Sequence, residues 1–391
     1  MSDLTLPAGT RGRKARTMKP GPLPFSLRVS FSLSPDDGQR GVTPDDTLFL
    51  LLEGVRTSGS LSQAARALGM SYRHAWGMMR EKEQQLGTEL IVKQRGRGAT
   101  LTAFGARLVW AQQRIMSRFV PVAASLEAEF LSELQEDLFA EKETLRLRAS
   151  HDLALPILRE EIEHRSSDVF VDLRFSGSEE NLKALAQGAC DIAGFHCARN
   201  QRKGSVQHIG YRRWLKPKEH RLIRFATRVQ GLMMRPSLDG QINSFSDIAR
   251  AGLRFINRQK GSGTRLVTDQ FLTDERVQPR QILGYDLEEY THLGVATRIA
   301  AGAADVGVGI EAAAQQMGLA FVPLVPEDYF LLVNEAGLEH GTITTLIEVL
   351  HDARFRRRVA NLAGYDTSDA GEVVRLTAAL PWYIAGSTRS P

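Results

Sequence analysis

The sequence predicts an α/β protein with a mostly α-helical N-terminal domain, a long helix after it and a larger α/β domain. Its 391 residues exceed what one ordinary hydrophobic core accommodates. Helical periodicity prevails up to about Glu143, and short apolar runs alternate with helical segments after that, which predicts βαβ units and a mainly parallel sheet. We expect these divisions: 1–23 a disordered basic arm, 24–102 the N-terminal domain, 103–143 the long helix, 144–340 the α/β domain, and 341–391 a C-terminal helical segment and tail.

Composition limits the class of protein. Hydrophobic residues make up 42% of the chain and charged residues 24%, as in globular proteins. No apolar run approaches the roughly 20 residues of a membrane span, and the N-terminal residues lack the apolar segment of a secretory signal. Cys190 and Cys197 are too few for a disulfide framework, and we interpret both as buried hydrophobic residues. We therefore expect a cytoplasmic protein without a membrane partner.

The two parts of the chain differ in charge. Residues 1–118 contain 18 Lys and Arg against 9 Asp and Glu, whereas the remainder contains 32 against 36. A basic N-terminal part beside a mildly acidic remainder indicates that the N-terminal part meets a polyanion. A solvated basic tail without any partner is the alternative.

The order of elements in the N-terminal domain is typical of a winged helix-turn-helix. A helix begins near Asp46, a short second helix is capped by Ser60 or Ser62, and a third runs from Ser71 to Gly87. Two strand-like runs then flank a basic glycine-rich tip. The long helix that follows contains Pro121, so we expect a kink or two helices there.

A winged helix-turn-helix places the start of its third helix in the DNA major groove. Arg73 is the strongest candidate for a base contact, and the tip arginines suit phosphate or minor-groove contact. An interaction module of three helices is the alternative interpretation. The candidate DNA-binding residues are Ser60, Ser62, Arg66, Ser71, Tyr72, Arg73, His74, Arg80, Arg95 and Arg97.

The segment from Thr47 to Ile115 carries a family resemblance. It contains the motif S-x-x-x-A-A-R-A-L-G-M-S-Y-R, then a Trp, then a G-R-G wing that leads to L-T-x-F-G. This combination resembles the DNA-binding domain of the molybdate-responsive ModE regulators. The segment is similar, more distantly, to the LysR-type regulators. The resemblance implies that the helix after the wing forms a homodimer on a two-fold DNA site, with a tetramer left open. The paired small β-barrels that bind molybdate in ModE are not recognisable here.

From about Thr144 the chain resembles the periplasmic-binding-protein-like domains that are fused to such regulators and to some molybdopterin-biosynthesis proteins. The matching pieces include Ala149–Pro156, Phe175–Ser178, Cys190–His196, Phe255–Arg265 and Ala304–Glu311. The resemblance implies two α/β lobes with a ligand cleft between them.

Loops that leave the carboxyl ends of strands line such a crevice, and their hydroxyl and backbone N–H groups suit an anion. The candidate ligand-binding residues are Ser150, His151, Ser176, Ser178, His196, Asn257, Arg258, Gly261, Ser262, Gly263, Thr264, Arg265 and Tyr290. The G-S-G-T turn is equally a plain helix cap. Arg258 is equally an inter-lobe salt-bridge residue, and His151 and His196 are equally core residues.

Together these features predict a DNA-binding transcription regulator that responds to a small anion and controls related metabolic genes. A molybdate- or tungstate-like oxyanion and a molecule related to the molybdenum cofactor are the expected effectors. The chain lacks a P-loop, a nucleophile–base motif and metal-spaced Cys and His residues, so it predicts no enzyme activity, resident cofactor or metal site. Two alternatives are a regulator for an unrelated organic metabolite and a molybdenum-cofactor enzyme with a DNA-binding head. A third is a transport binding protein, and the predicted DNA-binding domain argues against it.

Overall fold

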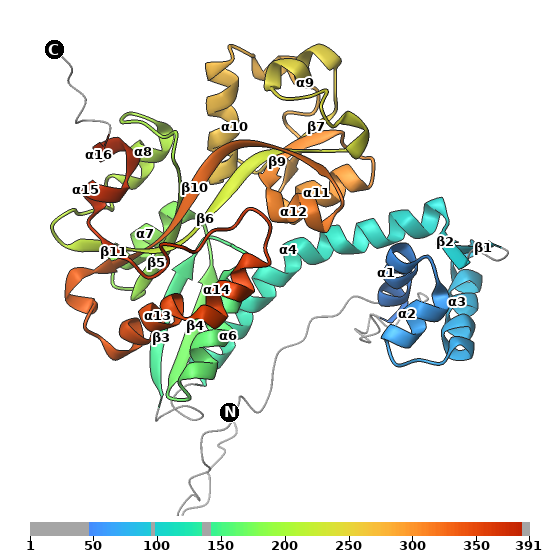
Figure 1. The fold of residues 1–391 in the computed structure, drawn as a ribbon, viewed down its shortest axis with the longest axis horizontal. Helices are drawn as coiled ribbons and strands as arrows, with labels where there is room; N and C mark the ends of the chain where they lie inside the picture. The colour runs from blue at the N-terminus through green and yellow to red at the C-terminus, as the bar shows by residue number, and fades with distance from the viewer. Residues whose placement is uncertain (1–46, 95–97, 135–141, 385–391) are drawn as a thin grey trace, which may run out of the picture.

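The computed structural model describes residues 47–94, 98–134 and 142–384. The predicted arm and the wing-tip residues Arg95 and Arg97 lie outside them. The N-terminal domain has three helices followed by an antiparallel hairpin (Figure 1). These elements are α1 (Thr47–Ser58), α2 (Leu61–Ala67), α3 (Tyr72–Leu86), β1 (Ile91–Gln94) and β2 (Gly98–Leu101).

The first two helices cross at a contact that requires small residues. A Cβ on Gly54 would lie 2.6 Å from the Cβ of Ala64, closer than carbon atoms normally approach. Ser60 begins α2 by accepting the N–H of Gln63, and Gly87 ends α3 in the left-handed conformation with φ 63°. The fully buried core of this domain includes Leu51, Leu52, Ala75, Met79 and Leu90.

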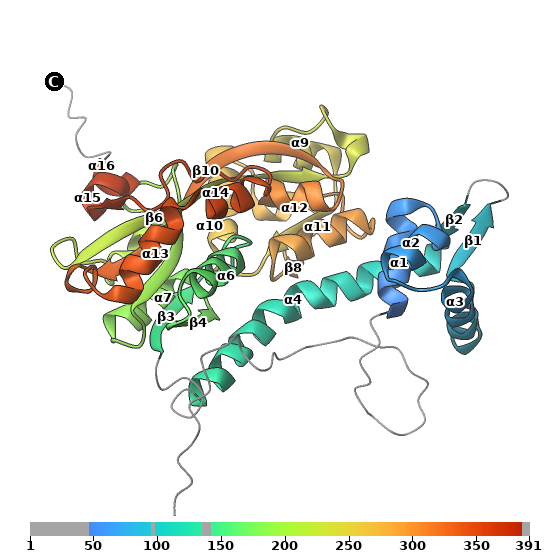
Figure 2. The ribbon, with the colours of Figure 1, turned by 60° about the horizontal axis from the view of Figure 1, so that its bottom comes forward.

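One long helix, α4 (Ala103–Glu133), leads from the N-terminal domain to the α/β domain. Thr102 caps its start by accepting the N–H of Gly105 at 3.0 Å. The helix continues for 31 residues through Pro121, so the expectation of two separate helices is wrong. In the turned view α4 runs beneath the α/β domain (Figure 2), where it contacts β4 and α11.

The α/β domain contains one mixed sheet in the order β4-β3-β5-β10-β6-β9-β7-β8. Lobe I contains the strands at one end of this order, and lobe II contains the strands at the other end. The strands of lobe I are β3 (Glu143–Ala149), β4 (Val169–Phe175) and β5 (Ile192–Ala198). The strands of lobe II are β7 (Phe255–Arg258), β8 (Glu288–Glu289) and β9 (Val306–Ile310).

Two strands of 15 residues each, β6 (His220–Met234) and β10 (Ala320–Asn334), cross between the lobes. They pair antiparallel with each other, with β5 on one side and with β9 on the other. The prediction of a mainly parallel sheet therefore holds within each lobe and is wrong for the centre. The register shifts between Pro323 and Val325, which lets β10 accommodate a proline without ending.

Helices cover both lobes (Figure 1). Lobe I has α6 (Leu155–Arg165), α7 (Ser178–Ala186), α8 (Val206–Tyr211), α13 (Gly341–His351), α14 (Ala353–Ala360), α15 (Leu376–Ala379) and α16 (Pro381–Ile384). Lobe II has α9 (Phe245–Ala251), α10 (Gly263–Asp274), α11 (His292–Ala300) and α12 (Glu311–Gln316).

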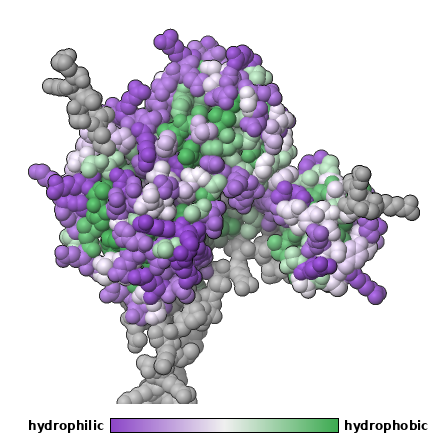
Figure 3. Space-filling model, viewed as in Figure 1, coloured by the Kyte–Doolittle hydropathy of each residue, from purple (hydrophilic) through white to green (hydrophobic). Residues whose placement is uncertain are grey.

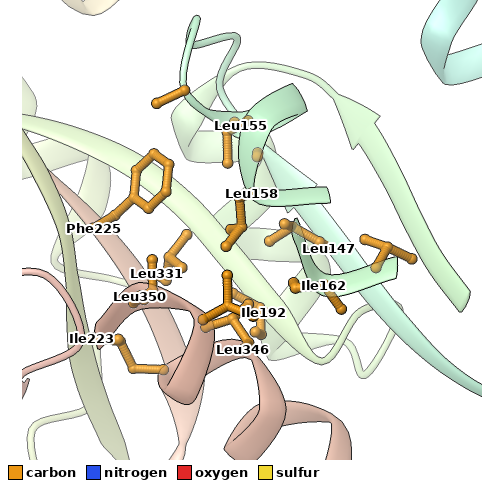
Figure 4. Packing of buried hydrophobic residues seen from close by; sticks show 14 of the residues in the cluster. Leu147, Leu155, Leu158, Ile162, Ile192, Ile223, Phe225, Leu331, Leu346 and Leu350 are labelled. Carbon is orange, nitrogen blue, oxygen red and sulfur yellow. The ribbon is translucent and has the colours of Figure 1, made fainter. Parts of the chain in front are cut away.

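The C-terminal segment is built into lobe I. Leu346 and Leu350 of α13 face Leu155, Leu158 and other apolar residues of the lobe I core (Figure 4). The short strand β11 (Val373–Val374) pairs with β6. Residues 341–384 thus complete the lobe rather than forming a separate appendage.

Hydrophilic residues cover much of the outer surface of both lobes in the view of Figure 3. Among the described residues, no helix is both long enough and apolar enough to cross a membrane.

Candidate functional site

The start of α3 presents an exposed polar surface beside the hairpin. The Ser71 hydroxyl accepts the N–H of His74 at 3.2 Å and so caps the helix. Tyr72, Arg73 and His74 are exposed, and neither Arg73 nor His74 forms an ion pair with a described residue. Unengaged polar side chains at a helix start have the geometry that reaches base edges in the major groove.

Trp76 connects α3 to the hairpin. Its ring stacks on Tyr72 with centroids 6.4 Å apart, and the Nζ of Lys93 on β1 lies 3.5 Å from the Trp76 centroid. The guanidinium of Arg80 lies 4.9 Å from the same ring. The contact of Lys93 with Trp76 holds the hairpin against α3, whereas that of Arg80 lies within the helix. Trp76 and Lys93 are not among the predicted DNA-binding residues, although the helical spacing of Tyr72, Trp76 and Arg80 was a visible signal for Trp76.

The other predicted DNA contacts have different environments. Ser60 is used as the cap of α2, whereas Ser62 and Arg66 are exposed on that helix. Arg80 is held by Trp76 and lies 3.8 Å from the Glu83 carboxylate, so its charge is already engaged.

A cavity of about 950 Å³ lies between the two lobes. Strand ends and helix starts of both lobes form its walls, together with part of α4. Lys and Arg side chains outnumber Asp and Glu side chains in its lining by six to three. Of the predicted ligand-binding residues, the lining contains Ser150, His151, Ser176, Ser178, His196, Arg258, Gly261, Ser262, Gly263, Thr264 and Tyr290.

Asn257 and Arg265 do not line this cavity, which corrects two of the predicted ligand contacts. The Asn257 side chain is buried and donates to the Tyr285 carbonyl at 3.2 Å. The Arg265 guanidinium lies over the Tyr285 ring at 4.2 Å and pairs with Asp269 at 3.1 Å. Both side chains therefore support the structure of lobe II.

Three helices begin at the cavity. Ser178, Gly263 and His292 are the first residues of α7, α10 and α11, and all three line it. The free N–H groups and positive dipole end of a helix start attract anions. The hydroxyl oxygens of Ser150 and Ser178 lie 2.6 Å apart, so the hydroxyl groups at this wall are mutually oriented.

Arg258 places a buried cation in the cavity wall. Its Nη2 donates to the Tyr290 carbonyl at 3.0 Å, and its Nε donates to Gln259 at 3.1 Å. Its Nη1 is buried without a hydrogen-bond partner among the described residues. Burial, followed by repulsion from Arg228, lowers the pKa of Arg258 to about 10. Both effects disfavour the charged form of Arg258, and an anion beside Nη1 would favour that form.

Arg228, and not Arg258, is the buried salt-bridge residue at the lobe junction. It lies on β6 and pairs with Asp152 at 2.7 Å and with Glu327 of β10 at 2.8 Å. Burial alone would lower the pKa of Arg228, but the attraction of Glu327, Tyr365 and Asp152 outweighs it and raises that pKa. The sequence alone gave no signal for this cluster, because its members are far apart along the chain.

The histidines of the cavity are neutral near pH 7. Burial lowers the pKa of His151 to about 4. Burial, reinforced by Arg228 and Arg258, places the pKa values of His196 and His292 well below the usual 6.5. These rings therefore contribute hydrogen-bonding groups and no charge.

The long helix contributes to the same cavity, although no residue of this helix was predicted to bind the ligand. Arg118, Pro121 and Val122 of α4 line it. The Arg118 guanidinium lies 4.8 Å from the Tyr290 ring and pairs with Glu289 of lobe II. In lobe I the backbone N–H of Phe175 donates to Ser125 of α4 at 2.9 Å. The helix is thus attached to both lobes.

Comparison with known proteins gives two family matches. Residues 48–106 match the bacterial regulatory helix-turn-helix proteins of the lysR family, and residues 159–351 match the PBP superfamily domain.

Individual relatives match different parts of the chain. The YvgK protein of Bacillus subtilis (strain 168) is 28% identical over 226 residues, which cover 58% of this chain and 72% of YvgK. The DNA-binding transcriptional dual regulator ModE of Escherichia coli (strain K12) is 36% identical over 76 residues, which cover 18% of this chain and only 29% of ModE. Among solved structures, an H2O2-bound mutant of Corynebacterium glutamicum OxyR aligns at 14% identity and TM-score 0.41 over 82% of this chain and 95% of that chain.

The helix-turn-helix match identifies a regulator rather than an enzyme. The chain joins a helix-turn-helix domain of the bacterial lysR type to a PBP superfamily domain, and it is a ligand-responsive DNA-binding transcription regulator of that type.

Proposed function

We propose that the effector of this regulator is a small anion that binds between the lobes and is held by Arg258. The observation that carries this proposal is the buried Nη1 of Arg258, which has no partner among the described residues. It belongs to a cation-rich lining onto which three helix starts open. Ser262 and Thr264 at the start of α10 are the proposed hydroxyl and N–H donors.

The size of the cavity favours an organic anion over a bare oxyanion. A volume of about 950 Å³ accommodates a drug-sized molecule. Phe175, Trp214 and Tyr290 also line the cavity and offer aromatic surface to such a molecule. An anionic fragment related to the molybdenum cofactor fits this description, as does an unrelated anionic metabolite. Molybdate or tungstate is the second candidate, favoured by the similarity to ModE over 76 residues.

We further propose that Tyr72, Arg73 and His74 contact double-stranded DNA from two copies of the chain. An exposed apolar stripe along α4 supports a homodimer. Its side chains are between 39% and 55% exposed and recur every three or four residues, as in a helix pair. They are Ile115, Phe119, Val122, Leu126 and Phe130.

Thermal unfolding of the full chain tests the effector. Molybdate, tungstate, sulfate, phosphate and formate are compared with a set of organic anions that includes phosphorylated pterins. A ligand at about a hundred times its Kd stabilises the folded protein by about 2.7 kcal/mol. Stabilisation that disappears in Arg258→Gln supports the proposed site, and the active compound separates the two effector classes. A ligand that stabilises wild type and Arg258→Gln equally contradicts the role of Arg258.

A further inference from the structure

A second cavity lies between α4 and the α/β domain, beside the interlobe cavity. Its volume is about 260 Å³. One face of α4 forms one wall, with Gln113, Met116 and Val120 spaced along it. The opposite wall comes from lobe II and includes Leu293 and Met317. The occupant of such a cavity would touch the helix that joins the two domains.

The walls are mainly apolar, but two buried polar atoms in lining residues have no partner. They are the Oε1 of Gln113 and the Nδ1 of His292, neither of which has a hydrogen-bond partner among the described residues. The His292 side chain is only 9% exposed. Buried polar atoms are normally hydrogen-bonded, so these two leave pairing capacity for a polar group of a ligand.

The charges at this cavity neutralise one another. Arg228 and Asp152 both line it and form an ion pair at 2.7 Å. No other Arg, Lys, Asp or Glu side chain lines this cavity among the described residues. The interlobe cavity, in contrast, has an excess of cations. An ionic ligand therefore finds a counter-charge between the lobes and not here.

We propose that this cavity is a second ligand site, for a neutral apolar molecule of one or two rings with a single hydrogen-bonding group. Protein interiors contain few voids larger than a water molecule. An apolar cavity of about 150 Å³ stays dry and binds benzene, so a larger one accommodates a larger ring system. The two cavities adjoin, and Pro121, His151, Arg228, Thr291 and His292 line both of them. Arg258 and the start of α10, on which the proposed effector site depends, line only the interlobe cavity.

Indole is a suitable probe, because it is a neutral and mainly apolar ring system with a single N–H donor. Titration calorimetry of the full chain with indole should give saturable binding of one molecule per chain. Val120 is 53% exposed, so Val120→Trp fills the cavity from its rim without disturbing a core. This variant should abolish indole binding, whereas Glu133→Trp at the far end of α4 and Arg258→Gln between the lobes should leave it unchanged.

A second variant tests the polar contact. Gln113→Leu should weaken indole binding about five- to tenfold and leave naphthalene, which lacks the N–H, unaffected. Absence of saturable binding by both compounds overturns the proposal. Indole binding that survives Val120→Trp, or that is lost in Arg258→Gln, also overturns it, because the molecule would then occupy another place. Loss of the anion response in Arg258→Gln with indole binding intact separates this site from the effector site.

Discussion

Arg118 of the long helix donates two hydrogen bonds to one carboxylate oxygen of Glu289, from Nε at 3.0 Å and from Nη2 at 2.7 Å. The Glu289 side chain is completely buried, and Arg298 holds its other oxygen at 2.8 Å. The backbone of Glu289 leads directly to Tyr290, whose carbonyl binds Arg258. A continuous chain of contacts therefore connects the effector cavity with α4.

Removal of the Arg118 charge should weaken the attachment of α4. Arg118→Met leaves the buried Glu289 oxygen without its donor, and the cost is about 1–3 kcal/mol of unfolding free energy. Urea denaturation measures it. Arg107→Met, an exposed position on the same helix, should change stability by less than about 0.5 kcal/mol. Equal stability of both variants would show that the ion pair contributes nothing.

Arg73 should carry base recognition. Arg73→Ala removes an exposed guanidinium at the start of α3 and should weaken DNA binding by about 1–3 kcal/mol, while the melting temperature stays unchanged. Gel shifts with a duplex selected by the wild-type protein from a random pool measure the loss. Arg357→Ala removes an exposed arginine of lobe I and serves as the charge-matched control. Undiminished binding by the Arg73 variant would remove this residue from the DNA interface.

Two glycine substitutions in the N-terminal domain should have opposite effects. Gly54→Ala places a methyl group against Ala64 and should destabilise the domain by about 1–3 kcal/mol. Gly77→Ala meets open space within α3 and should stabilise it by about 0.5–1 kcal/mol. Scanning calorimetry of both variants compares the transition of this domain. A stabilising Gly54→Ala would mean that α1 and α2 can separate without loss.

Stability should decrease with acidity because the cavity buries neutral histidines. The pKa of His151 is about 4 in the folded chain and ordinarily 6.5, so the unfolded chain binds more protons between these values. The stability that His151 contributes is complete above about pH 6.5 and is lost as the pH falls towards 4. Between about pH 7 and pH 5, His151→Gln should lose less stability than wild type. Parallel curves for wild type and His151→Gln would contradict this origin.

A charge in the apolar stripe of α4 should prevent dimer formation. Leu126 is 55% exposed, and Leu126→Glu would place a carboxylate in the proposed helix contact. Analytical ultracentrifugation should find wild type as a dimer and this variant as a monomer. Val206→Glu in lobe I introduces the same charge at an apolar position that is 67% exposed and should remain dimeric. Dimeric Leu126→Glu would place the interface elsewhere.

The helix-turn-helix was predictable because its signals are local. Caps such as Ser71 and breaks such as Gly87 act within a few residues, and the structure uses both as the sequence indicated. Most of the cavity lining was also predictable, since the carboxyl ends of strands must meet.

The errors arise from side-chain direction and from long-range contact. Asn257 and Arg258 are neighbours on β7, and successive side chains of a strand point to opposite faces, so only Arg258 lines the cavity. Thr264 and Arg265 are likewise neighbours in the first turn of α10, and only Thr264 lines the cavity. Arg118 could not be foreseen, because its place in the cavity depends on how a helix lies across two lobes.

Because α4 is attached to both lobes and begins at the N-terminal domain, a movement of the lobes would also move that domain. Its 31 residues span about 46 Å at 1.5 Å per residue. The lobes are joined through β6 and β10, two paired strands of 15 residues each, so a change in the angle between the lobes would require twist in these strands. Arg118, where α4 meets the effector cavity, lies 15 residues from Ala103, or about 22 Å at 1.5 Å per residue, so a tilt of about 5° there would displace the start of the helix by about 2 Å. A slight change at the effector cavity would therefore shift the N-terminal domain by a distance below the roughly 3.4 Å step between base pairs.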